Sequence, residues 1–200
     1  MTALRTDLQI ISEWINPSSR VLDLGCGDGT LLKHLKEFRR VNAYGLEIEI
    51  NNVVQCVASG INVIQADLNA GLSEFDTDSF DYVLMTQTLQ AVQHPDRLLN
   101  DMLRVGREGI VTFPNFGHWR SRLQIALGGH MPVTPTLPSK WFNTSNIHLC
   151  TLRDFEQLCS DNGIDIIERC VVDSQHRGSL GMRLLPNLLG EVAIYRFKRK

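Results

Sequence analysis

The stretch "RVLDLGCGDGTLLKHL", residues 20–35, decides the fold. Its first five residues form a short, largely apolar run of the kind found in buried strands. Three alternating glycines, Gly25, Gly27 and Gly29, follow at once, and leucines at helical spacing come after them. The stretch therefore predicts a strand, a tight glycine turn and a helix, in that order.

Strand and helix patterns alternate along the rest of the chain. An amphipathic helix is predicted ahead of the first strand, over 5–15. Later strands are predicted over 42–48, 61–67, 80–87 and 109–115, with helices between them over 50–59 and 95–106. A helix over 151–163, with Thr151 as its N-cap, precedes two antiparallel last strands at 164–174 and 190–199. This alternation predicts a doubly wound, mostly parallel α/β sheet.

Residues 116–148 interrupt the alternation. They are rich in glycine, proline and aromatic residues. We interpret them as an irregular insertion in a single domain that spans 1–200, with one short helix over 119–127. A long, aromatic-rich loop after a strand suits either a lid over a ligand or a docking surface for a partner, and the sequence leaves both open.

Composition narrows the class of protein. The chain is 43% hydrophobic and 21% charged, as in ordinary globular proteins, and its net charge of -2 argues against a nucleic-acid or membrane-surface binder. Charges interrupt the apolar pattern of the first 15 residues, so no signal peptide is expected. Five dispersed cysteines without a CxxC pair indicate reduced thiols in the cytoplasm, with no disulfide framework and no metal site.

The glycine turn predicts a ligand site of open identity. A strand that feeds a helix through such a turn presents unpaired backbone N–H groups and the positive end of the helix dipole. The spacing is G-x-G-x-G, and Thr30 stands where a dinucleotide-binding motif has its third glycine. This departure disfavours an NAD-dependent oxidoreductase, while a purely structural tight turn stays possible.

Acidic residues end three consecutive predicted strands. Asp23 precedes the glycine turn and suits a ligand with a positive amino group. Glu47 ends the second strand, where an acid can accept the hydroxyls of a ribose. Asp67 ends the third strand, where it either accepts a hydrogen bond from an exocyclic amine or is an ordinary surface carboxylate. Together they predict a ligand with an amino-acid head, a ribose and an adenine.

These residues resemble the class I S-adenosylmethionine-dependent methyltransferases. The resemblance rests on "VLDLGCGDG" (21–29), "GLEI" (45–48), "QADL" (65–68) and "FDYVLMTQTLQAV" (80–92). It implies a Rossmann-like, mostly parallel seven-stranded sheet whose last strand is antiparallel. It also implies S-adenosylmethionine or S-adenosylhomocysteine as the ligand, bound by Asp23, Gly25, Cys26, Gly27, Gly29, Glu47, Ile48, Asp67, Leu68, Thr86 and Gln87.

Nearly the whole chain resembles the MetW family of methionine biosynthesis proteins. The resemblance covers "LRTDLQIISEWI" (4–15), residues 79–124 and residues 131–159, and "FPNFGHW" and "NIHLCT" are its most specific parts. It implies a methyltransferase-like domain that acts with the homoserine O-acyltransferase MetX. It leaves open a regulatory subunit, an active methyltransferase on an unidentified small acceptor, and self-association.

The chain offers a single weak candidate for a catalytic group. His118 follows the fifth predicted strand and suits a general base, although packing of this histidine within "NFGHW" is the simpler interpretation. Methyl transfer needs mainly alignment of donor and acceptor, so a base is optional. Cys26 resembles a nucleophile at a helix N-terminus, but no histidine neighbours it in the sequence. The catalytic residues are therefore left unassigned.

Overall fold

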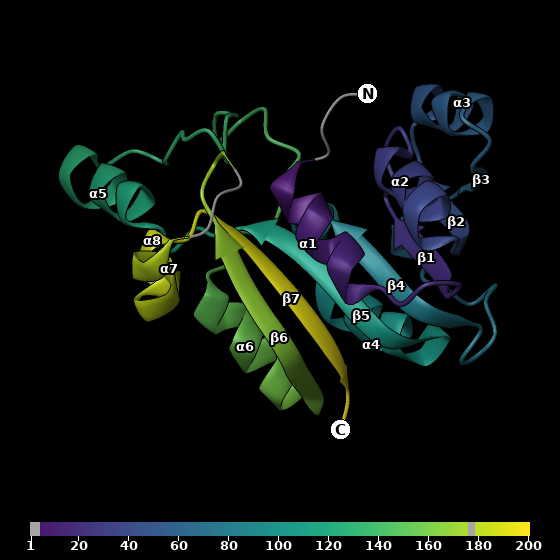
Figure 1. Cartoon of the computed structure of the whole chain (residues 1–200). Helices are drawn as coiled ribbons and strands as arrows, with labels where there is room; N and C mark the ends of the chain where they lie inside the picture. The colour runs from purple at the N-terminus through teal and green to yellow at the C-terminus, as the bar shows by residue number, and fades with distance from the viewer. Residues whose placement is uncertain (1–4, 176–178) are drawn as a thin grey trace.

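The computed structural model describes residues 5–175 and 179–200. It places seven strands in one sheet with the order β3-β2-β1-β4-β5-β7-β6 (Figure 1). The strands are β1 Arg20–Leu24, β2 Asn42–Glu47, β3 Asn62–Gln65, β4 Phe80–Thr86, β5 Gly106–Pro114, β6 Ile164–Val172 and β7 Val192–Arg199. β1 to β5 pair in parallel, and β7 is antiparallel to both β5 and β6. The predicted sheet and its antiparallel last strand are confirmed.

Helices cover both faces of the sheet because successive strand residues point to opposite sides. Val21 packs on one face among the apolar side chains of α1 Thr6–Trp14, α2 Thr30–Arg39 and α3 Ile50–Ala58. Leu22 and Leu24 pack on the other face with those of α4 Pro95–Val105 and α6 Leu152–Asp161. The sheet is therefore the middle of three layers, as expected of a doubly wound fold.

Helix boundaries follow the predictions to within two residues. Thr151 caps α6 with a complete capping box, because its side chain accepts from the Asp154 N–H while the Asp154 carboxylate accepts from the Thr151 N–H. The predicted opening helix is α1, and Leu4 of the family-like opening stretch lies outside the described residues. Strand β5 begins at Gly106, three residues before the predicted start, since α4 passes into it without a loop.

Four short helices lack a matching prediction. Two are single 3-10 turns that follow strand ends, η1 Leu68–Ala70 and η2 Leu89–Ala91. The others, α7 Leu180–Leu184 and α8 Pro186–Leu189, connect β6 to β7. Segments of three to five residues are too short to show a helical repeat in the sequence.

The predicted insertion begins with α5 Trp119–Gly128, one residue longer than the predicted helix. Turns and loops follow from 129 to 151, with one isolated bridge between Thr134 and Leu137. Figure 1 shows α5 projecting away from the sheet, beside α7 and α8. Whether this insertion acts as a lid or as a docking surface stays a prediction.

Candidate cofactor site

The predicted cofactor residues gather at the carboxyl edge of the sheet. Strand order reverses between β1 and β4, since β2 and β3 lie on one side of β1 and β5 on the other side of β4. Ligands of open α/β sheets bind outside the strand ends at such a switch point. Asp23 and Gly25 reach it from β1, and Thr86 and Gln87 reach it from β4. The topology therefore joins segments that are about sixty residues apart in the sequence.

Two adjoining cavities occupy this edge. The first has a volume of about 370 Å³ and contains six of the predicted residues: Asp23, Gly25, Cys26, Gly27, Thr86 and Gln87. The second has a volume of about 510 Å³ and contains Gly25, Glu47, Ile48, Asp67, Leu68 and Gln87. Gly25 and Gln87 line both, so the two cavities form one cleft. We call them the β1 half and the β2–β3 half.

The glycine turn needs its glycines for different reasons. All three have positive φ, of 74° at Gly25, 56° at Gly27 and 78° at Gly29, a region that L side chains rarely adopt. A Cβ at Gly25 would lie 2.6 Å from Thr88 Oγ1, and one at Gly29 would lie 2.8 Å from Cys56 Sγ. A Cβ at Gly27 would meet no protein atom within 4 Å. Gly27 therefore faces open space, while Gly29, which does not line the cleft, serves packing.

The Glu47 carboxylate holds the turn and the end of β2 together. Its Oε2 accepts a hydrogen bond from the Gly27 N–H at 2.8 Å. Its Oε1 accepts from the N–H groups of Ile48 and Glu49, both at 2.9 Å. The side chain is buried. A carboxylate has about four lone-pair sites, so one acceptor site remains on Oε2 for a further donor.

Asp23 is a buried carboxyl with an orphaned oxygen. It is only 1% exposed, and its Oδ1 has no hydrogen-bond partner. Burial, and then the nearby Glu47 charge, raise the pKa of Asp23 to about 7. Buried polar groups are nearly always paired, so this oxygen calls for a donor. Since Asp23 lines the β1 half, that donor can come from a ligand.

Gln87, directly after β4, lines both halves of the cleft. Gln87 has a φ of 57°, which is unusual for a residue other than glycine. Its N–H donates to both the carbonyl and the hydroxyl of Thr112 on β5, each at 3.0 Å. Its carbonyl accepts from Gln90 Nε2 at 2.6 Å. These contacts fix a strained turn at the point where the two halves of the cleft meet.

Asp67 and two apolar side chains border the β2–β3 half. Asp67 is exposed, and its Oδ1 accepts from the backbone and side-chain amides of Asn69, both at 2.9 Å. The carboxylate thus caps η1. Ile48 is 54% exposed and Leu68 is half-buried. Apolar side chains beside the Asp67 carboxylate suit the flat, partly polar ring system of a base.

Cys26 is unsuited to act as a nucleophile. Burial above all, with the nearby Asp23 and Cys56, raises the pKa of the Cys26 thiol far above its ordinary value. Its sulfur lies 3.8 Å from the Cys56 sulfur, and the Cys56 thiol donates to the Gly27 carbonyl at 3.3 Å. Both residues pack beneath the turn as small apolar side chains.

His118 does not line either half of the cleft. It is buried as the N-cap residue of α5, its N–H donates to the Asn115 carbonyl, and burial lowers the pKa of its ring. Asn115 is equally structural, because its Nδ2 donates to the carbonyls of Asn187 and Gly190 and its Oδ1 accepts from Gly117. The packing interpretation of "NFGHW" therefore describes these side chains better than a role as base.

Several residues that line the cleft were not among the predicted cofactor residues, and two of them, Arg5 and Ser145, come from distant segments. Arg5 lines the β1 half, and its guanidinium pairs with the Asp7 carboxylate at 2.8 Å. Ser145, from the insertion, lines the β2–β3 half. Both lie in stretches that resemble the MetW family, but that resemblance assigned neither of them to the cofactor, and each reaches the cleft through the packing of a distant segment. A charge at the start of an amphipathic helix is too common to single out Arg5.

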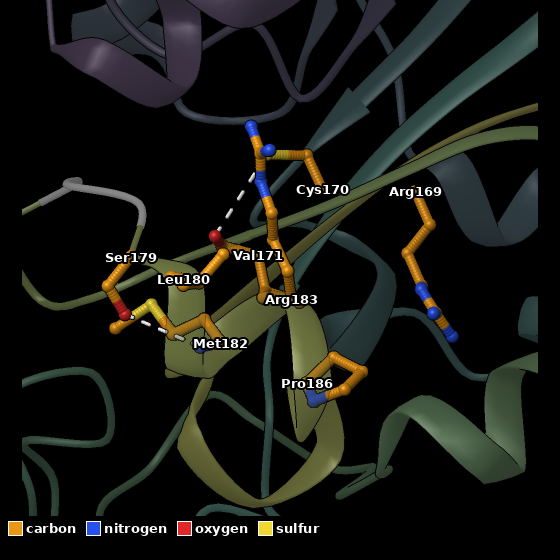
Figure 2. A pocket seen from close by; sticks show the side chains of 8 residues that line it. All are labelled: Arg169, Cys170, Val171, Ser179, Leu180, Met182, Arg183 and Pro186. Carbon is orange, nitrogen blue, oxygen red and sulfur yellow. Dashed lines mark hydrogen bonds between the residues drawn. The ribbon is translucent and has the colours of Figure 1, made fainter.

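Another cavity, larger than either half of the cleft by itself, lies away from these residues. Its volume is about 640 Å³. Figure 2 shows the side chains that line it, which come from β6, from Ser179 and α7, and from Pro186 of α8. Arg169 and Arg183 border it, and Arg169 is already paired with Glu156 at 2.7 Å. None of the predicted cofactor residues lines it. The candidate site is therefore identified by its chemistry and its place at the switch point.

The described residues lack both a metal-binding cluster and a membrane-spanning helix. Within residues 5–175 and 179–200, no three His, Cys, Asp or Glu side chains gather as a metal site requires. Over the same ranges, no helix has the length and apolar character to cross a membrane.

The strand order, the antiparallel last strand and the cleft define the class I methyltransferase fold. Solved structures share it. An S-adenosylmethionine-dependent methyltransferase from Mesorhizobium loti superposes with a TM-score of 0.71 at 17% identity, over 97% of this chain and 98% of that one. The [4+2]-cyclase SpnF superposes with a TM-score of 0.68 at 17% identity, over 96% and 80%. At these identities the likeness establishes the fold alone.

Sequence comparison places the chain more narrowly. A sequence model of "Methionine biosynthesis protein MetW" matches residues 5–197, so the chain belongs to the MetW family. It is 36% identical over 206 residues to the bifunctional methionine biosynthesis protein MetXA/MetW of Rhodopirellula baltica. That alignment covers 98% of this chain and 33% of the relative. The chain therefore spans about a third of the length of the curated relative that it matches.

Proposed function

We propose that the cleft binds S-adenosylmethionine or S-adenosylhomocysteine, with the amino-acid end in the β1 half and the adenosine end in the β2–β3 half. The orphaned Oδ1 of Asp23 is the observation that carries this proposal. A buried carboxyl without a partner suits a ligand that brings a protonated amine. The same side chain is a poor neighbour for a phosphate, which is the group that a dinucleotide would place at this turn.

Other residues of the cleft fit the rest of the ligand. The Arg5 guanidinium suits the carboxylate of the amino-acid end. The remaining acceptor site on Glu47 Oε2 suits one ribose hydroxyl, since the other three sites receive backbone N–H groups. Ile48 and Leu68 provide apolar contact for adenine, and Asp67 an acceptor for its amino group. When bound, S-adenosylmethionine supplies an activated methyl group, while its product lacks one.

The fused relative supports a role beside an acyltransferase. Its printed name joins MetXA to MetW, and this chain matches a third of its length. Proteins that are fused in one organism are often partners as separate chains in another. We therefore propose that this chain acts in methionine biosynthesis together with a homoserine O-acyltransferase of the MetX type, in the reducing cytoplasm that its five free thiols suit.

Isothermal titration calorimetry tests the ligand. We expect the wild-type protein to bind both S-adenosylmethionine and S-adenosylhomocysteine, and Asp23→Asn to bind at least 10-fold more weakly, because an amide cannot offer a charged acceptor to the amine. Asp165→Asn, on the exposed side of β6, is the matched control. Absence of binding, or equal binding by Asp23→Asn, would overturn the ligand assignment.

Co-expression with the homoserine O-acyltransferase of the same organism tests the role. We expect the two chains to co-purify and the acyl-transfer rate of the acyltransferase to change when this chain is present. The partnership would be overturned if this chain changed neither the acyl-transfer rate of the acyltransferase nor its elution volume in size-exclusion chromatography. Assay of S-adenosylhomocysteine formation in the same mixtures reports methyl transfer independently, so an active methyltransferase is detected if present.

A further inference from the structure

Exposed apolar side chains are concentrated on the insertion. Of the twenty large hydrophobic residues found exposed in the described chain, ten lie within residues 119–149. They are Trp119, Leu123, Ile125, Leu127, Met131, Val133, Trp141, Phe142, Ile147 and Leu149. We call these ten side chains the insertion surface. Scattered exposed hydrophobics are normal, but a concentration in one segment marks an interaction site.

Helix α5 has almost no packing within the chain. Ser121 is its one buried residue, whereas Leu127 is 82% exposed. Helices of about ten residues depend on burial of an apolar face, because they are marginal in isolation. Figure 1 shows α5 projecting away from the sheet that carries the fold. The apolar side chains of α5 thus lack the partner that a helix of this length needs.

Four other side chains of the insertion surface, those of Met131, Trp141, Ile147 and Leu149, line a small groove. A cavity of about 130 Å³ is bordered by Phe116, Met131, Leu137, Trp141, Ile147 and Leu149. Gln124 on α5 joins this segment through reciprocal hydrogen bonds with the backbone of Val133. Trp141 and Phe142 lie edge to face with ring centroids 5.7 Å apart, and they are 75% and 66% exposed. Exposed aromatic pairs beside a small pocket are typical of interface hot spots.

The segment that carries the insertion surface contains basic residues and no acidic ones. No aspartate or glutamate occurs between Glu108 and Asp154. Arg120 lies over the Trp119 ring at 5.4 Å, and Lys140 lies 6.0 Å from the Phe142 ring. Two copies of this surface meeting face to face would bring like charges together, which is costly at an interface. The surface therefore suits an apolar patch with an acidic rim on a different protein.

We infer that the insertion surface docks the homoserine O-acyltransferase, through a patch of that enzyme that is apolar at its centre and acidic at its rim. This inference rests on the proposed partnership, since the MetXA/MetW relative is what indicates the occupant. Docking buries the apolar side of α5 and fills the groove beside Trp141. It also assigns the insertion a role as a docking surface in addition to the one residue, Ser145, that it lends to the cleft.

Affinity measurements on paired variants test this inference. We expect Trp141→Ala and Phe142→Ala each to weaken binding to the co-expressed acyltransferase by about 30-fold, the size of a hot-spot effect. Phe38→Ala, an aromatic side chain on α2 that is 59% exposed, is the matched control and should bind as the wild type does. Lys140→Glu should weaken binding and reduce its salt dependence, while Lys33→Glu on α2 should not.

The outcomes separate the two proposals. A wild-type complex that survives Trp141→Ala and Phe142→Ala overturns the docking surface and leaves the partnership standing. Absence of any wild-type complex overturns both, and binding of S-adenosylmethionine then still stands on its own titration. The docking assignment is also overturned if the wild-type protein forms no acyltransferase complex and instead self-associates in a way that Trp141→Ala or Phe142→Ala abolishes. The same holds if it instead sediments with phosphatidylglycerol vesicles and Lys140→Glu abolishes that sedimentation. Thermal melts and cofactor titrations of each variant exclude misfolding, because the altered side chains are exposed.

Discussion

Glu47 and Gly27 are joined by a hydrogen bond of 2.8 Å from the Gly27 N–H to Glu47 Oε2. The bond connects the end of β2 to the glycine turn after β1. The same carboxylate also accepts from Ile48 and Glu49. One side chain thus shapes the turn and borders the proposed ribose site, so its loss affects stability and ligand binding together.

We expect Glu47→Ala to lower the free energy of unfolding by roughly 1 to 3 kcal/mol, because backbone N–H groups lose their acceptor in a partly buried setting. It should also weaken binding of S-adenosylmethionine at least 10-fold. Urea denaturation and calorimetry measure the two effects. Glu13→Ala, an exposed glutamate on α1, is the control. A Glu47→Ala protein as stable as Glu13→Ala would contradict the role of these hydrogen bonds.

The raised pKa of Asp23 predicts that the protein releases a proton when the ligand binds. The pKa of Asp23 is about 7 in the folded protein against an ordinary 3.8, so the carboxyl is partly protonated near neutral pH. A bound ammonium group favours the ionised form and lowers this pKa, so affinity should rise between pH 6 and pH 7.5. Calorimetry at pH 7 in buffers of different ionisation enthalpy measures the protons released. The release should vanish in Asp23→Asn, and an unchanged release there would assign the proton to another group.

The same shift predicts how stability depends on pH without ligand. The raised pKa means that the folded state favours the protonated carboxyl. The contribution of Asp23 to the free energy of unfolding is therefore highest below about pH 4 and falls as the pH rises to about 7. Asp23→Asn removes the penalty of a buried charge. We expect it to be more stable than the wild type by roughly 4 kcal/mol at pH 8 and by less at pH 5, as urea denaturation at the two pH values will measure.

Gly25 and Gly27 should respond differently to the same substitution. Both have positive φ, which costs an alanine roughly 1 to 2 kcal/mol. Gly25→Ala should cost roughly 1 to 3 kcal/mol more, since its Cβ would lie 2.6 Å from Thr88 Oγ1, while Gly27→Ala meets no neighbour. Urea denaturation ranks the two variants. A second substitution, Thr88→Ala, should restore part of the stability of Gly25→Ala and none of that of Gly27→Ala.

The parts of the molecule that local sequence encodes were predictable. The strand, glycine turn and helix of residues 20–35 each depend on neighbours within a few positions. The same holds for the acids at or near the ends of β1, β2 and β3, which are Asp23, Glu47 and Asp67. The resemblance to the class I methyltransferases then implied a seven-stranded sheet with an antiparallel last strand, whereas the order of the strands was not predicted. Phe113 and Tyr195, stacked at 5.9 Å, show how the distant strands β5 and β7 are finally held together.

Features that depend on tertiary packing were not predictable. Arg5 and Ser145 reach the cleft from distant segments to which no cofactor role was assigned. The hydrogen bond between Glu47 and Gly27 depends on the parallel pairing of β1 and β2, which brings Leu24 opposite Leu46. His118 looked accessible because it follows a strand, whereas the contacts of Asn115 with the α8 region turn this segment into a packed corner. Sequence spacing cannot distinguish a side chain that faces a cleft from one that faces the interior.

Gln90 links the cleft to the insertion surface. This link predicts that a ligand bound in the cleft changes the dynamics of the insertion. The Gln90 side chain donates to the Gln87 carbonyl at 2.6 Å, and the Gln90 carbonyl accepts from the N–H groups of Ile147 and His148 at 2.9 and 3.0 Å. A ligand that contacts Gln87 should steady this turn and therefore the two amides that it holds. We expect S-adenosylhomocysteine to slow their hydrogen exchange, measured by mass spectrometry, along with that of the glycine turn.

A variant of Gln90 isolates this link. Gln90→Ala removes the side-chain bond to Gln87 and leaves the backbone carbonyl in place, so the amides of Ile147 and His148 should lose most of their ligand-dependent protection while Gly27 retains its own. Gln93→Ala, whose backbone carbonyl accepts from His148 and whose side chain is exposed, is the control. Protection confined to the glycine turn in the wild type would show that the cleft and the insertion surface are independent. Because linkage is reciprocal, a confirmed response also means that docking at the insertion surface changes the affinity for the ligand.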